Sequence, residues 1–220
     1  MSNNNMKTSK QSIARLHSYR EALYRLKYLG FVKVFSDNLA DAIGATASQV
    51  RKDFSIFGLI GNKKGGYVID ELINKLDELL GKNQPQHIIV VGSGNIGKAL
   101  MSYKGFGKVG IHVVAAFDTD EAKTNRAAEI PILPLGELKE FAKQRHIKVG
   151  VIAVPDTAAQ QVLEMMISAG IKGVLNFAPI RLNCPEHFVL NNVNLGIELE
   201  TVVYFVNALN RQAHDEKSKS

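Results

Sequence analysis

The stretch IIVVGSGNIGKAL, residues 88–100, joins a short apolar run to three closely spaced glycines and then to a segment of helical character. Gly92, Gly94 and Gly97 have the G-x-G-x-x-G spacing of a tight strand-to-helix turn. A helix that begins near Asn95 directs free backbone N–H groups toward phosphate oxygens. The stretch therefore predicts a pyrophosphate site. The residues expected around it are Gly92, Ser93, Gly94, Asn95, Ile96 and Gly97.

The residues that follow support this interpretation. A second apolar strand, IHVVAAF at 111–117, ends at Asp118, which comes twenty-one residues after Gly97. An acidic residue at this distance holds the ribose hydroxyls of NAD(H), and it repels the 2′-phosphate of NADP(H). NAD(H) is therefore the expected ligand. The alternative is a glycine-rich turn in an unrelated α/β sheet.

Strand and helix patterns continue to alternate after Asp118. Helical patterns at 135–146 and 157–170 alternate with apolar strands at 149–155 and 173–179. This order predicts an α/β fold with a Rossmann-like, doubly wound parallel sheet and its ligand at the carboxyl ends of the strands. The candidates for a nicotinamide pocket at these ends are Pro155, Asn176, Phe177, Ala178 and Pro179. The alternative is that these residues only end the strands and begin the loops.

The positive charge of the chain is concentrated in its first third. Residues 1–69 hold eleven Lys or Arg and four Asp or Glu, a net charge of +7, whereas the whole chain carries +6. A basic segment joined to a nearly neutral one indicates a polyanionic partner for the basic segment. A generic solvated basic surface is the alternative.

The basic segment has the pattern of a winged helix-turn-helix. Apolar residues keep helical spacing over 13–29, and a second helix, capped by Ser36, is expected at 37–44. Thr46 is expected to cap a third helix at 47–57. Two short strand-like pieces around a turn rich in lysine and glycine follow, and another amphipathic helix ends the segment.

The third helix presents polar residues away from its apolar positions Val50, Phe54 and Phe57. A helix fits the major groove of DNA, where glutamine pairs with adenine, and arginine or lysine with guanine. Lysines at a flexible wing tip suit a narrow minor groove or a phosphate. The residues expected to contact double-stranded DNA are Ser48, Gln49, Arg51, Lys52, Ser55, Lys63 and Lys64. The alternative is a small helical bundle with solvated basic side chains.

The segment GKNQPQ, residues 81–86, separates the two halves of the chain, because Gly, Asn and Pro together favour turns and end helices and strands. We expect a winged-helix DNA-binding domain at 1–84, a Rossmann NAD(H)-binding domain at 85–195, a dimerisation helix at 196–213 and a disordered tail at 214–220. The dimerisation helix is apolar on more than one face and needs burial, which a second copy supplies. A homodimer also presents two copies of the third helix, called the reading helix below, to a palindromic DNA site.

Bulk composition excludes several other classes of protein. Hydrophobic residues make up 45% of the chain and charged residues 22%, so wholesale disorder is not expected. The apolar runs are too short to span a membrane, and the N-terminus has no signal-peptide pattern. A lone cysteine, Cys184, excludes an internal disulfide framework and fits a reducing cytoplasm. The histidines and the cysteine do not fall at metal-ligand spacing, so no metal is expected.

The pattern favours a binding protein over an enzyme. After the sheet a single helical segment remains, whereas a dehydrogenase needs a second domain or long loops to hold its substrate. None of the tyrosines is followed four residues later by lysine, so a Tyr-x-x-x-Lys pair for hydride chemistry is absent. No catalytic residue is expected. An NAD(H)-dependent oxidoreductase with an N-terminal oligomerisation domain remains the main alternative, and a domain for a CoA-type nucleotide is a second.

Taken together, these motifs resemble the Rex family of bacterial redox-sensing transcriptional repressors. The resemblance runs from about Ile13 to Asn210. The segments that carry it are QVRKDFSIFG at 49–58, GNKKGGY at 61–67, VVGSGNIGKAL at 90–100, AFDTDEAK at 116–123, GIKGVLNFAP at 170–179 and YFVN at 204–207. It implies a dimer, with the tail helix exchanged between subunits, that binds operator DNA when NAD⁺ prevails and releases it when NADH rises. It also implies that Tyr103 lies beside the nicotinamide.

Three positions depart from the pattern of that family. Ile56 replaces a usual tyrosine of the reading helix, Glu21 replaces a usual arginine of the first helix, and Asn194 replaces a usual aspartate before the tail helix. In the family, that arginine and that aspartate belong to the link between nucleotide state and the position of the DNA-binding domain. The resemblance therefore implies an altered or specialised switch in this chain.

Overall fold

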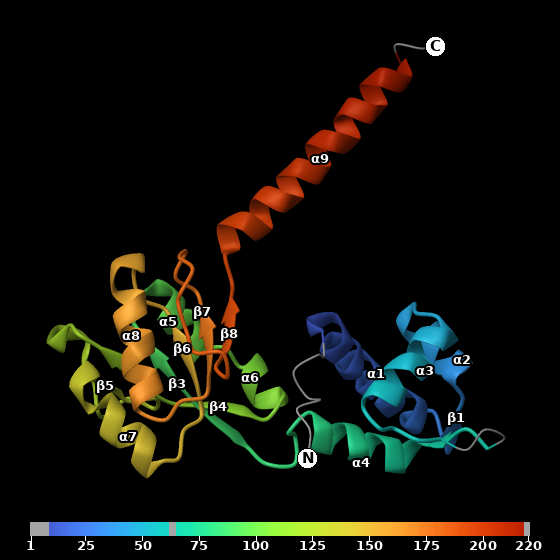
Figure 1. Ribbon diagram of the computed structural model, residues 1–220, viewed down its shortest axis with the longest axis horizontal. Coiled ribbons are helices and arrows are strands. Elements are labelled where there is room, and N and C mark those ends of the chain that lie inside the picture. Colours follow the sequence, from blue (N-terminus) through green and yellow to red (C-terminus); the bar gives the residue numbers. More distant parts are fainter. Residues whose placement is uncertain (1–8, 62–64, 218–220) are drawn as a thin grey trace. The chain divides into compact units, whose positions relative to one another are not determined.

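The computed structural model describes residues 9–61 and 65–217 of the 220-residue chain. The chain folds into two compact units, which comprise Met1–Pro85 and Gln86–Ser220. Figure 1 shows the largely helical first unit and the second unit with its sheet. Each unit has its own apolar core.

The first unit, within its described residues, combines four helices with a two-stranded sheet. Its elements are α1 (Lys10–Tyr28), β1 (Lys33–Val34), α2 (Ser36–Ile43), α3 (Ala47–Ile56), β2 (Tyr67–Val68) and α4 (Ile69–Leu79). Leu16 and Leu23 of α1, Phe54 of α3 and Leu76 of α4 are almost completely buried in its core. The ring of Tyr19 meets the ring of Phe54 edge to face, with the ring centroids 5.3 Å apart. This core fixes α3 against α1.

The turn between α2 and α3 has the expected form, but the start of α2 does not. Gly44 ends α2 with a φ of 69°, and the Thr46 side chain accepts a hydrogen bond from the first turn of α3 at 3.1 Å. The cap predicted at Thr46 is thereby confirmed. The cap predicted at Ser36 is wrong, because Phe35 occupies the cap position of α2. The Asn38 side chain accepts from the Phe35 backbone N–H at 3.1 Å instead.

The strand pairing of the first unit differs from the predicted hairpin. β2 pairs antiparallel with β1, so that Val34 lies opposite Tyr67. Residues 59–61, the start of the first expected strand, are not in a strand. Because β1 has only two residues and lies between two helices, it offers no alternation of apolar and polar residues that a sequence pattern would reveal.

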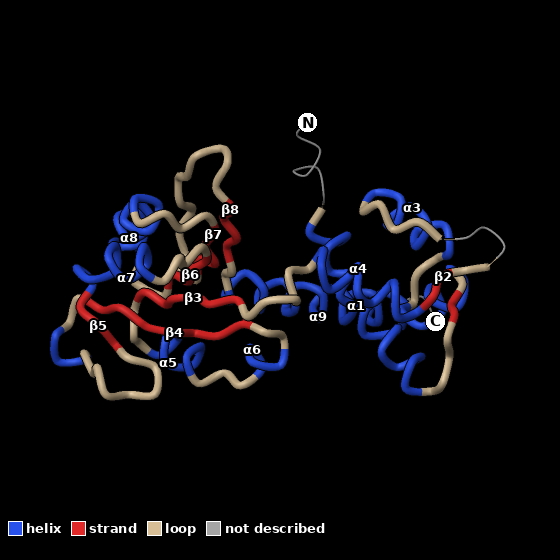
Figure 2. Tube along the Cα trace, turned by 90° about the horizontal axis from the view of Figure 1, so that it is seen from below, coloured by secondary structure: helices blue, strands red, loops and turns tan. Residues whose placement is uncertain are grey.

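The second unit contains a six-stranded parallel sheet (Figure 2). Its strands are β3 (Gln86–Val91), β4 (Ile111–Asp118), β5 (Ile132–Pro134), β6 (Val149–Ile152), β7 (Gly173–Asn176) and β8 (Val189–Asn192). Their order across the sheet is β5-β4-β3-β6-β7-β8, and each pairs in parallel with its neighbours. This order is the 3-2-1-4-5-6 arrangement of the dinucleotide-binding fold. The α/β fold class predicted from the sequence is confirmed, and β8 adds a strand that the pattern did not indicate.

Helices cover both faces of this sheet (Figure 2). The helices α5 (Asn95–Met101) and α6 (Gly105–Lys108) lie on one face, and α7 (Leu138–Gln144) and α8 (Asp156–Ser168) lie on the other. Short 3₁₀ turns, η1 (Glu121–Lys123) and η2 (Leu135–Glu137), follow β4 and β5. Buried apolar side chains fill both interfaces, so ligands reach the sheet only at its ends.

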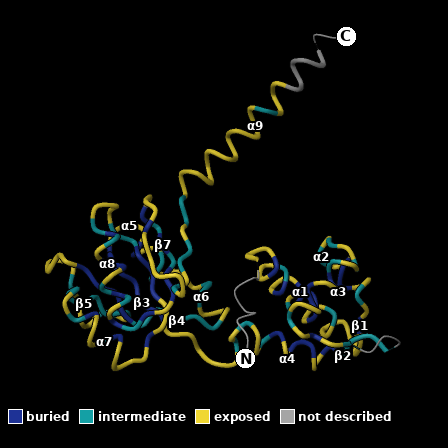
Figure 3. The backbone as a smooth tube through the Cα atoms, viewed as in Figure 1, coloured by how far each residue is buried: buried dark blue, intermediate teal, exposed yellow. Residues whose placement is uncertain are grey.

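The chain ends in α9 (Leu195–Lys217), which differs from every other helix in its exposure (Figure 3). Large apolar side chains of α9 remain in solvent, among them Leu199, Phe205 and Leu209, which are 66%, 61% and 65% exposed. The helix is longer than the range 196–213 expected from the sequence. Within the described part of the chain, no helix combines the length and apolarity that crossing a membrane requires.

Candidate nucleotide pocket and DNA-contacting helix

The turn after β3 is built from its glycines. Gly92 has a φ of 97°, in the left-handed region that glycine favours. Gly97 packs against it so closely that a Cβ at Gly97 would lie 1.9 Å from the Gly92 carbonyl oxygen. Gly94 stands at the N-terminal cap of α5, where a Cβ would meet nothing within 4 Å. The turn therefore holds α5 close to β3 and leaves the space in front of Gly94 open.

Asp118, at the end of β4, is hydrogen bonded to this turn. Its Oδ2 accepts from the Ser93 backbone N–H at 2.8 Å and from the Ser93 hydroxyl at 2.6 Å. Its Oδ1 accepts from the Asp120 backbone N–H at 3.0 Å. Burial alone would raise the pKa of Asp118, but these hydrogen bonds, helped by Lys123, lower that pKa to about 2. Asp118 is therefore a carboxylate at neutral pH, ready to accept hydrogen bonds from hydroxyl groups.

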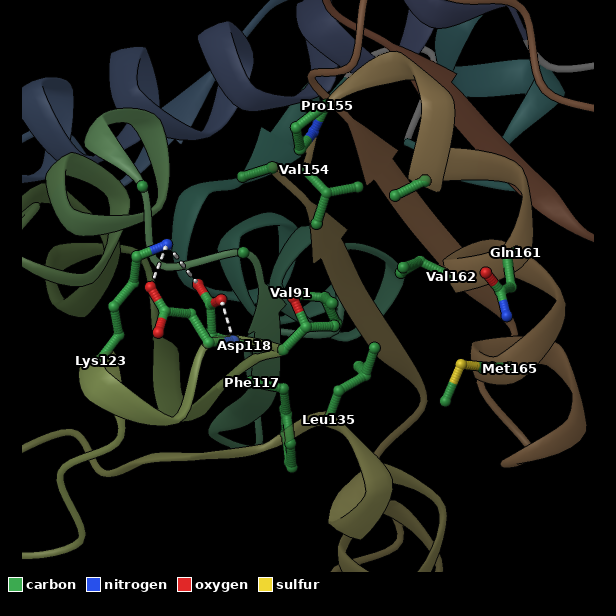
Figure 4. A pocket seen from close by; sticks show the side chains of 16 residues that line it. Val91, Phe117, Asp118, Lys123, Leu135, Val154, Pro155, Gln161, Val162 and Met165 are labelled. Atoms are coloured by element: carbon green, nitrogen blue, oxygen red, sulfur yellow. Dashed lines mark hydrogen bonds and ion pairs between the residues drawn. The ribbon is translucent and has the colours of Figure 1, made fainter.

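A cavity of about 430 Å³ opens beside Asp118 and the glycine turn (Figure 4). At its polar end the Lys123 ammonium lies 3.6 Å from an oxygen of Asp118 and 3.6 Å from an oxygen of Asp120. Its other walls are mainly apolar and are contributed by Leu135, Val154 and residues of α8. The α8 side chains that line it are Ala158, Gln161, Val162 and Met165. Polar groups at one end and apolar walls at the other suit a nucleoside.

Several of these lining residues escaped sequence reasoning. Lys123 ends the segment AFDTDEAK at 116–123, but neither the motif nor the spacing assigns it a place in the nucleotide site. Val162 and Met165 have the spacing of an ordinary helix core, and Val162 does belong to the core of the second unit. Only the three-dimensional structure, in which the ends of β4 and β6 lie beside α8, shows that Val162 and Met165 face a cavity.

The predicted nicotinamide residues lie where β6 and β7 end. Pro155 lines the cavity, whereas Asn176 and Ala178 are buried at the end of β7 and Pro179 is exposed. In a sheet of this order, the two halves of a dinucleotide lie on opposite sides of the first strand, which is β3 here. The cavity beside β4 corresponds to the adenosine side, and the loop after β7, with half-buried Phe177, lies on the other side.

Two further groups of predicted residues lie outside the cavity. Asn95 and Ile96 are exposed in the first turn of α5, next to Gly94. Tyr103 is 60% exposed and packs edge to face on Phe106, with the ring centroids 5.0 Å apart. Tyr103 lines a separate, more open groove beside the start of β4. The structure of this chain therefore does not bring Tyr103 to the cavity that holds Asp118.

The reading helix α3 is tied to α1 by a buried carboxylate that sequence reasoning missed. Asp53, which is 0% exposed, accepts hydrogen bonds from Arg15 Nε at 2.6 Å and from a terminal Arg15 nitrogen at 2.8 Å. It also accepts from the Tyr19 hydroxyl at 2.9 Å and from Gln49 Nε2 at 2.9 Å. Burial alone would raise the pKa of Asp53, but the bonds from Arg15, Tyr19 and Gln49 outweigh burial and lower that pKa. Gln49 is thereby held in one orientation.

The other predicted DNA contacts of α3 are free to meet a partner. Ser48, Arg51, Lys52 and Ser55 are all exposed. They lie on the side of α3 away from buried Val50 and Phe54, as the helical spacing predicts. Lys63 and Lys64, the expected wing contacts, lie outside the described residues.

The three departures from the Rex pattern also have defined places. Ile56 is 54% exposed at the end of α3, and Glu21 is exposed on α1. Asn194 precedes α9, where its Oδ1 accepts from the backbone N–H groups of Gly196 at 3.0 Å and Ile197 at 3.2 Å. An asparagine therefore caps α9 as an aspartate would, but without the negative charge.

Two family models match the two units. Residues 7–55 match the model described as "Putative DNA-binding protein N-terminus", and residues 83–180 match the model described as "CoA binding domain". The first covers α1 to α3 and the second covers the glycine turn, the cavity and β7. The match in the first unit agrees with the charge of that segment.

Curated relatives match almost the whole chain. A "Redox-sensing transcriptional repressor Rex" from Desulforamulus reducens is 38% identical over 200 residues, which cover 90% of this chain and 95% of the relative. The protein of that name from Pelotomaculum thermopropionicum is 36% identical over 200 residues, with coverage of 90% and 94%. A third, from Clostridium botulinum, is 39% identical over 196 residues, with coverage of 89% and 93%.

Solved structures show the same likeness. A crystal structure of RSP with β-NAD⁺ and operator DNA is 29% identical, covers 98% of this chain and 100% of its own, and superposes with a TM-score of 0.86. A structure of RSP with β-NADH is 30% identical, covers 96% and 99%, and has a TM-score of 0.77. RSP is described as a Rex-family repressor. With this agreement over both units, the chain belongs to the Rex family of redox-sensing transcriptional repressors.

Proposed function

We propose that this protein is a homodimeric repressor that binds palindromic operator DNA and releases it when NADH replaces NAD⁺. The observation that carries this proposal is the presence, in one chain, of a basic reading helix and a dinucleotide turn with an ionised ribose acceptor. Support comes from the RSP complexes, which contain β-NAD⁺ with operator DNA in one case and β-NADH in another. The protein acts by binding and carries out no hydride turnover. A DNA-reading role and the lone cysteine support action in the cytoplasm.

The residues around the cavity fit NAD(H). Asp118 would accept from a ribose hydroxyl, and Leu135 and Val154 would flank the adenine ring. The volume lies within the range of about 300–1,000 Å³ that is usual for ligand sites. Gly94 leaves room for the pyrophosphate to approach the backbone. Gly92, Gly97 and Ser93 would act by shaping the turn, because Ser93 donates to Asp118 and is itself buried.

Discrimination between the two redox forms must occur at the nicotinamide, because NAD⁺ and NADH share their adenine half. The oxidised ring is cationic and the reduced ring is neutral. An apolar pocket imposes a desolvation cost on the cation alone and so favours NADH. Asn176 and the loop at 177–179 would form that pocket, together with Tyr103 if the partner subunit or the bound nucleotide brings it close, whereas Pro155 lines the cavity on the adenosine side. The resulting preference changes the spacing of the two reading helices.

A second copy of the chain would cover α9. A helix with large apolar side chains on several faces is stable in water only when a partner buries them. Two-fold symmetry would then place two copies of α3 before the two halves of a palindrome. Gln49, Arg51, Lys52 and Ser48 would contact the DNA in each half, with Ser55 and the wing lysines beside them.

Operator titrations test the proposed function directly. The wild-type protein first selects a duplex from a random-sequence pool in the presence of NAD⁺, and its affinity for that duplex is then measured with saturating NAD⁺ and with saturating NADH. We expect NADH to weaken binding by about 5- to 150-fold, which corresponds to a coupling of about 1–3 kcal/mol. Equal affinities would reject redox sensing. Competition of CoA with NADH would indicate that the second unit prefers a different nucleotide.

Two substitutions should separate the two binding activities. We expect Arg51→Ala to weaken operator binding by about 1–3 kcal/mol and to leave NADH affinity unchanged, because Arg51 is exposed on α3. Asp118→Ala should lower NADH affinity by about 10- to 100-fold, since a charge-assisted hydrogen bond is worth about 1.5–3 kcal/mol, while leaving operator binding intact. NADH fluorescence and gel shifts measure the two affinities. Loss of both activities in either variant would point to misfolding instead.

A further inference from the structure

A buried asparagine connects the loop after β7 to the strand that leads into α9. Asn176 is 0% exposed, and its Oδ1 accepts from the Ala178 backbone N–H at 3.0 Å. Its Nδ2 lies 3.1 Å from the Ala178 carbonyl oxygen, 3.2 Å from the Ile180 carbonyl oxygen and 2.9 Å from Oδ1 of Asn192. Since the surrounding carbonyl oxygens can only accept, the orientation of this amide is unambiguous.

The surroundings of this amide create a competition. An asparagine Nδ2 has two N–H groups, but three oxygen acceptors surround it here. Two of the acceptors belong to the loop at 178–180, and the third belongs to Asn192 at the end of β8. A small displacement of the loop toward or away from Asn176 therefore changes how firmly Asn192 is held.

Asn192 is separated from the cap of α9 by a single residue. The backbone N–H of that residue, Val193, donates to the Asn176 carbonyl oxygen at 2.8 Å. Asn194 follows, and its side chain caps α9. The loop on the nicotinamide side of the fold and the segment that leads into α9 are thus both hydrogen bonded to Asn176.

We propose that the hydrogen bond from Asn176 to Asn192 couples the loop at 177–180 to the first turn of α9, which makes Asn192 a positioning residue of the redox response. The inference rests on the proposed function, because it requires that loop to respond to the nicotinamide and α9 to join the two subunits. Asn192 does not line the cavity beside Asp118, and the reading helix belongs to the other unit. Its loss should therefore change the communication between the two sites and leave each site intact.

Asn192 is a suitable target because its removal leaves no buried polar group without a partner. Asn192 is exposed, and without it Asn176 still has the Ala178 and Ile180 carbonyl oxygens as acceptors for its two N–H groups. The variant Asn192→Ala should therefore fold as the wild type does. Asn192→Asp keeps an oxygen acceptor at the same place and should preserve the bond. Gln144→Ala serves as a control, since Gln144 is exposed on α7 and bonds only to Glu140 among the described contacts.

The experiment measures the ratio of operator affinities in saturating NAD⁺ and saturating NADH for the full-length wild type and each variant. We expect Asn192→Ala to reduce this ratio at least threefold, with the NADH dissociation constant and the NAD⁺-state operator affinity within twofold of wild type. Asn192→Asp and Gln144→Ala should keep the wild-type ratio. Hydrogen exchange of the amides of residues 196–200 should respond to NADH in the wild type and not in Asn192→Ala.

Each other outcome contradicts the inference in a recognisable way. An unchanged ratio in Asn192→Ala would show that the bond carries no coupling. A ratio lost equally in Asn192→Ala and Asn192→Asp would show that the retained acceptor is irrelevant, and the inference would fail. A wild-type ratio near one would instead overturn the proposed function itself, and this inference with it.

Discussion

Replacing Gly97 with alanine is expected to abolish useful NADH binding, with a loss of affinity of at least about 100-fold, or about 3 kcal/mol. The new Cβ would lie 1.9 Å from the Gly92 carbonyl oxygen, whereas real Cβ contacts stay beyond 3.0 Å. Both groups belong to the backbone core of the turn, so neither can rotate away. The helix α5 must move outward by about 1 Å, and a displacement of that size is enough to disorganise a preformed site.

The matched control for this substitution is Gly107→Ala in α6 of the same unit. A Cβ at Gly107 meets nothing within 4 Å, so this variant should bind NADH as the wild type does. NADH fluorescence titration measures both affinities, and thermal unfolding reports whether the second unit remains folded. We expect Gly97→Ala to retain operator binding that no longer responds to NADH. Wild-type NADH affinity in Gly97→Ala would show that α5 can shift without cost and would refute the close-packing argument.

Asp53→Ala is expected to produce the largest loss of stability in the first unit, about 2–4 kcal/mol. The substitution leaves Arg15 without its buried partner and deprives Tyr19 and Gln49 of their acceptor. This loss lies at and below the lower end of the range of about 3–5 kcal/mol for broken buried ion pairs, because the Arg15 side chain is still 26% exposed and water can solvate it. Operator binding should weaken with stability, since Gln49 loses its fixed orientation. Chemical denaturation followed by circular dichroism gives the free energy of unfolding.

Acidification should remove the same contribution in the wild-type protein. Because the pKa of Asp53 is lower in the folded state, its stabilising effect is complete above the ordinary value near 3.8 and declines as pH falls through the depressed native value. Stability of the first unit should therefore fall more steeply below pH 4 in the wild type than in Asp53→Ala. If the curves of stability against pH ran parallel in the two proteins, Asp53 would not be the cause of the loss of stability at low pH.

Asp70→Ala provides the comparison for Asp53→Ala. Asp70 forms an ion pair with Lys27 at 2.7 Å, but both side chains are more than half exposed, so water and salt screen the pair. The variant should unfold like the wild type. A loss equal to that of Asp53→Ala would mean that burial does not distinguish the two carboxylates.

The sequence was sufficient for the features that depend on local spacing. Gly92, Gly94, Gly97 and Asp118 follow a spacing that a strand–turn–helix unit requires, and the alternation of strands and helices implies the parallel sheet. The cap at Thr46 also depends only on its neighbours. These elements need no knowledge of distant contacts, and the structure has them where the pattern predicts.

The features that escaped prediction depend on contacts that form only when the chain folds, and most of these join residues far apart in the sequence. From the sequence alone, Asp53 is expected to be a polar residue on an exposed face of the helix. Its burial depends on Arg15, thirty-eight positions earlier. The two-residue strand β1 exists only because β2 pairs with it. Lys123 becomes part of the pocket only when η1 folds back toward Asp118. Burial, long-range pairing and the folding of an irregular loop decide these cases, and none of them leaves a periodic signal.

Under the proposed dimerisation, the exposed apolar side chains of α9 make each chain dependent on a second copy made in the same cell. A cell that makes both a normal chain and one with a damaged turn, such as Gly97→Ala, would assemble mixed pairs along with matched ones. With equal synthesis and random pairing, about half of all pairs would be mixed and about a quarter wholly normal. One defective gene copy would then blunt the response of most molecules, so such alleles should behave as dominant.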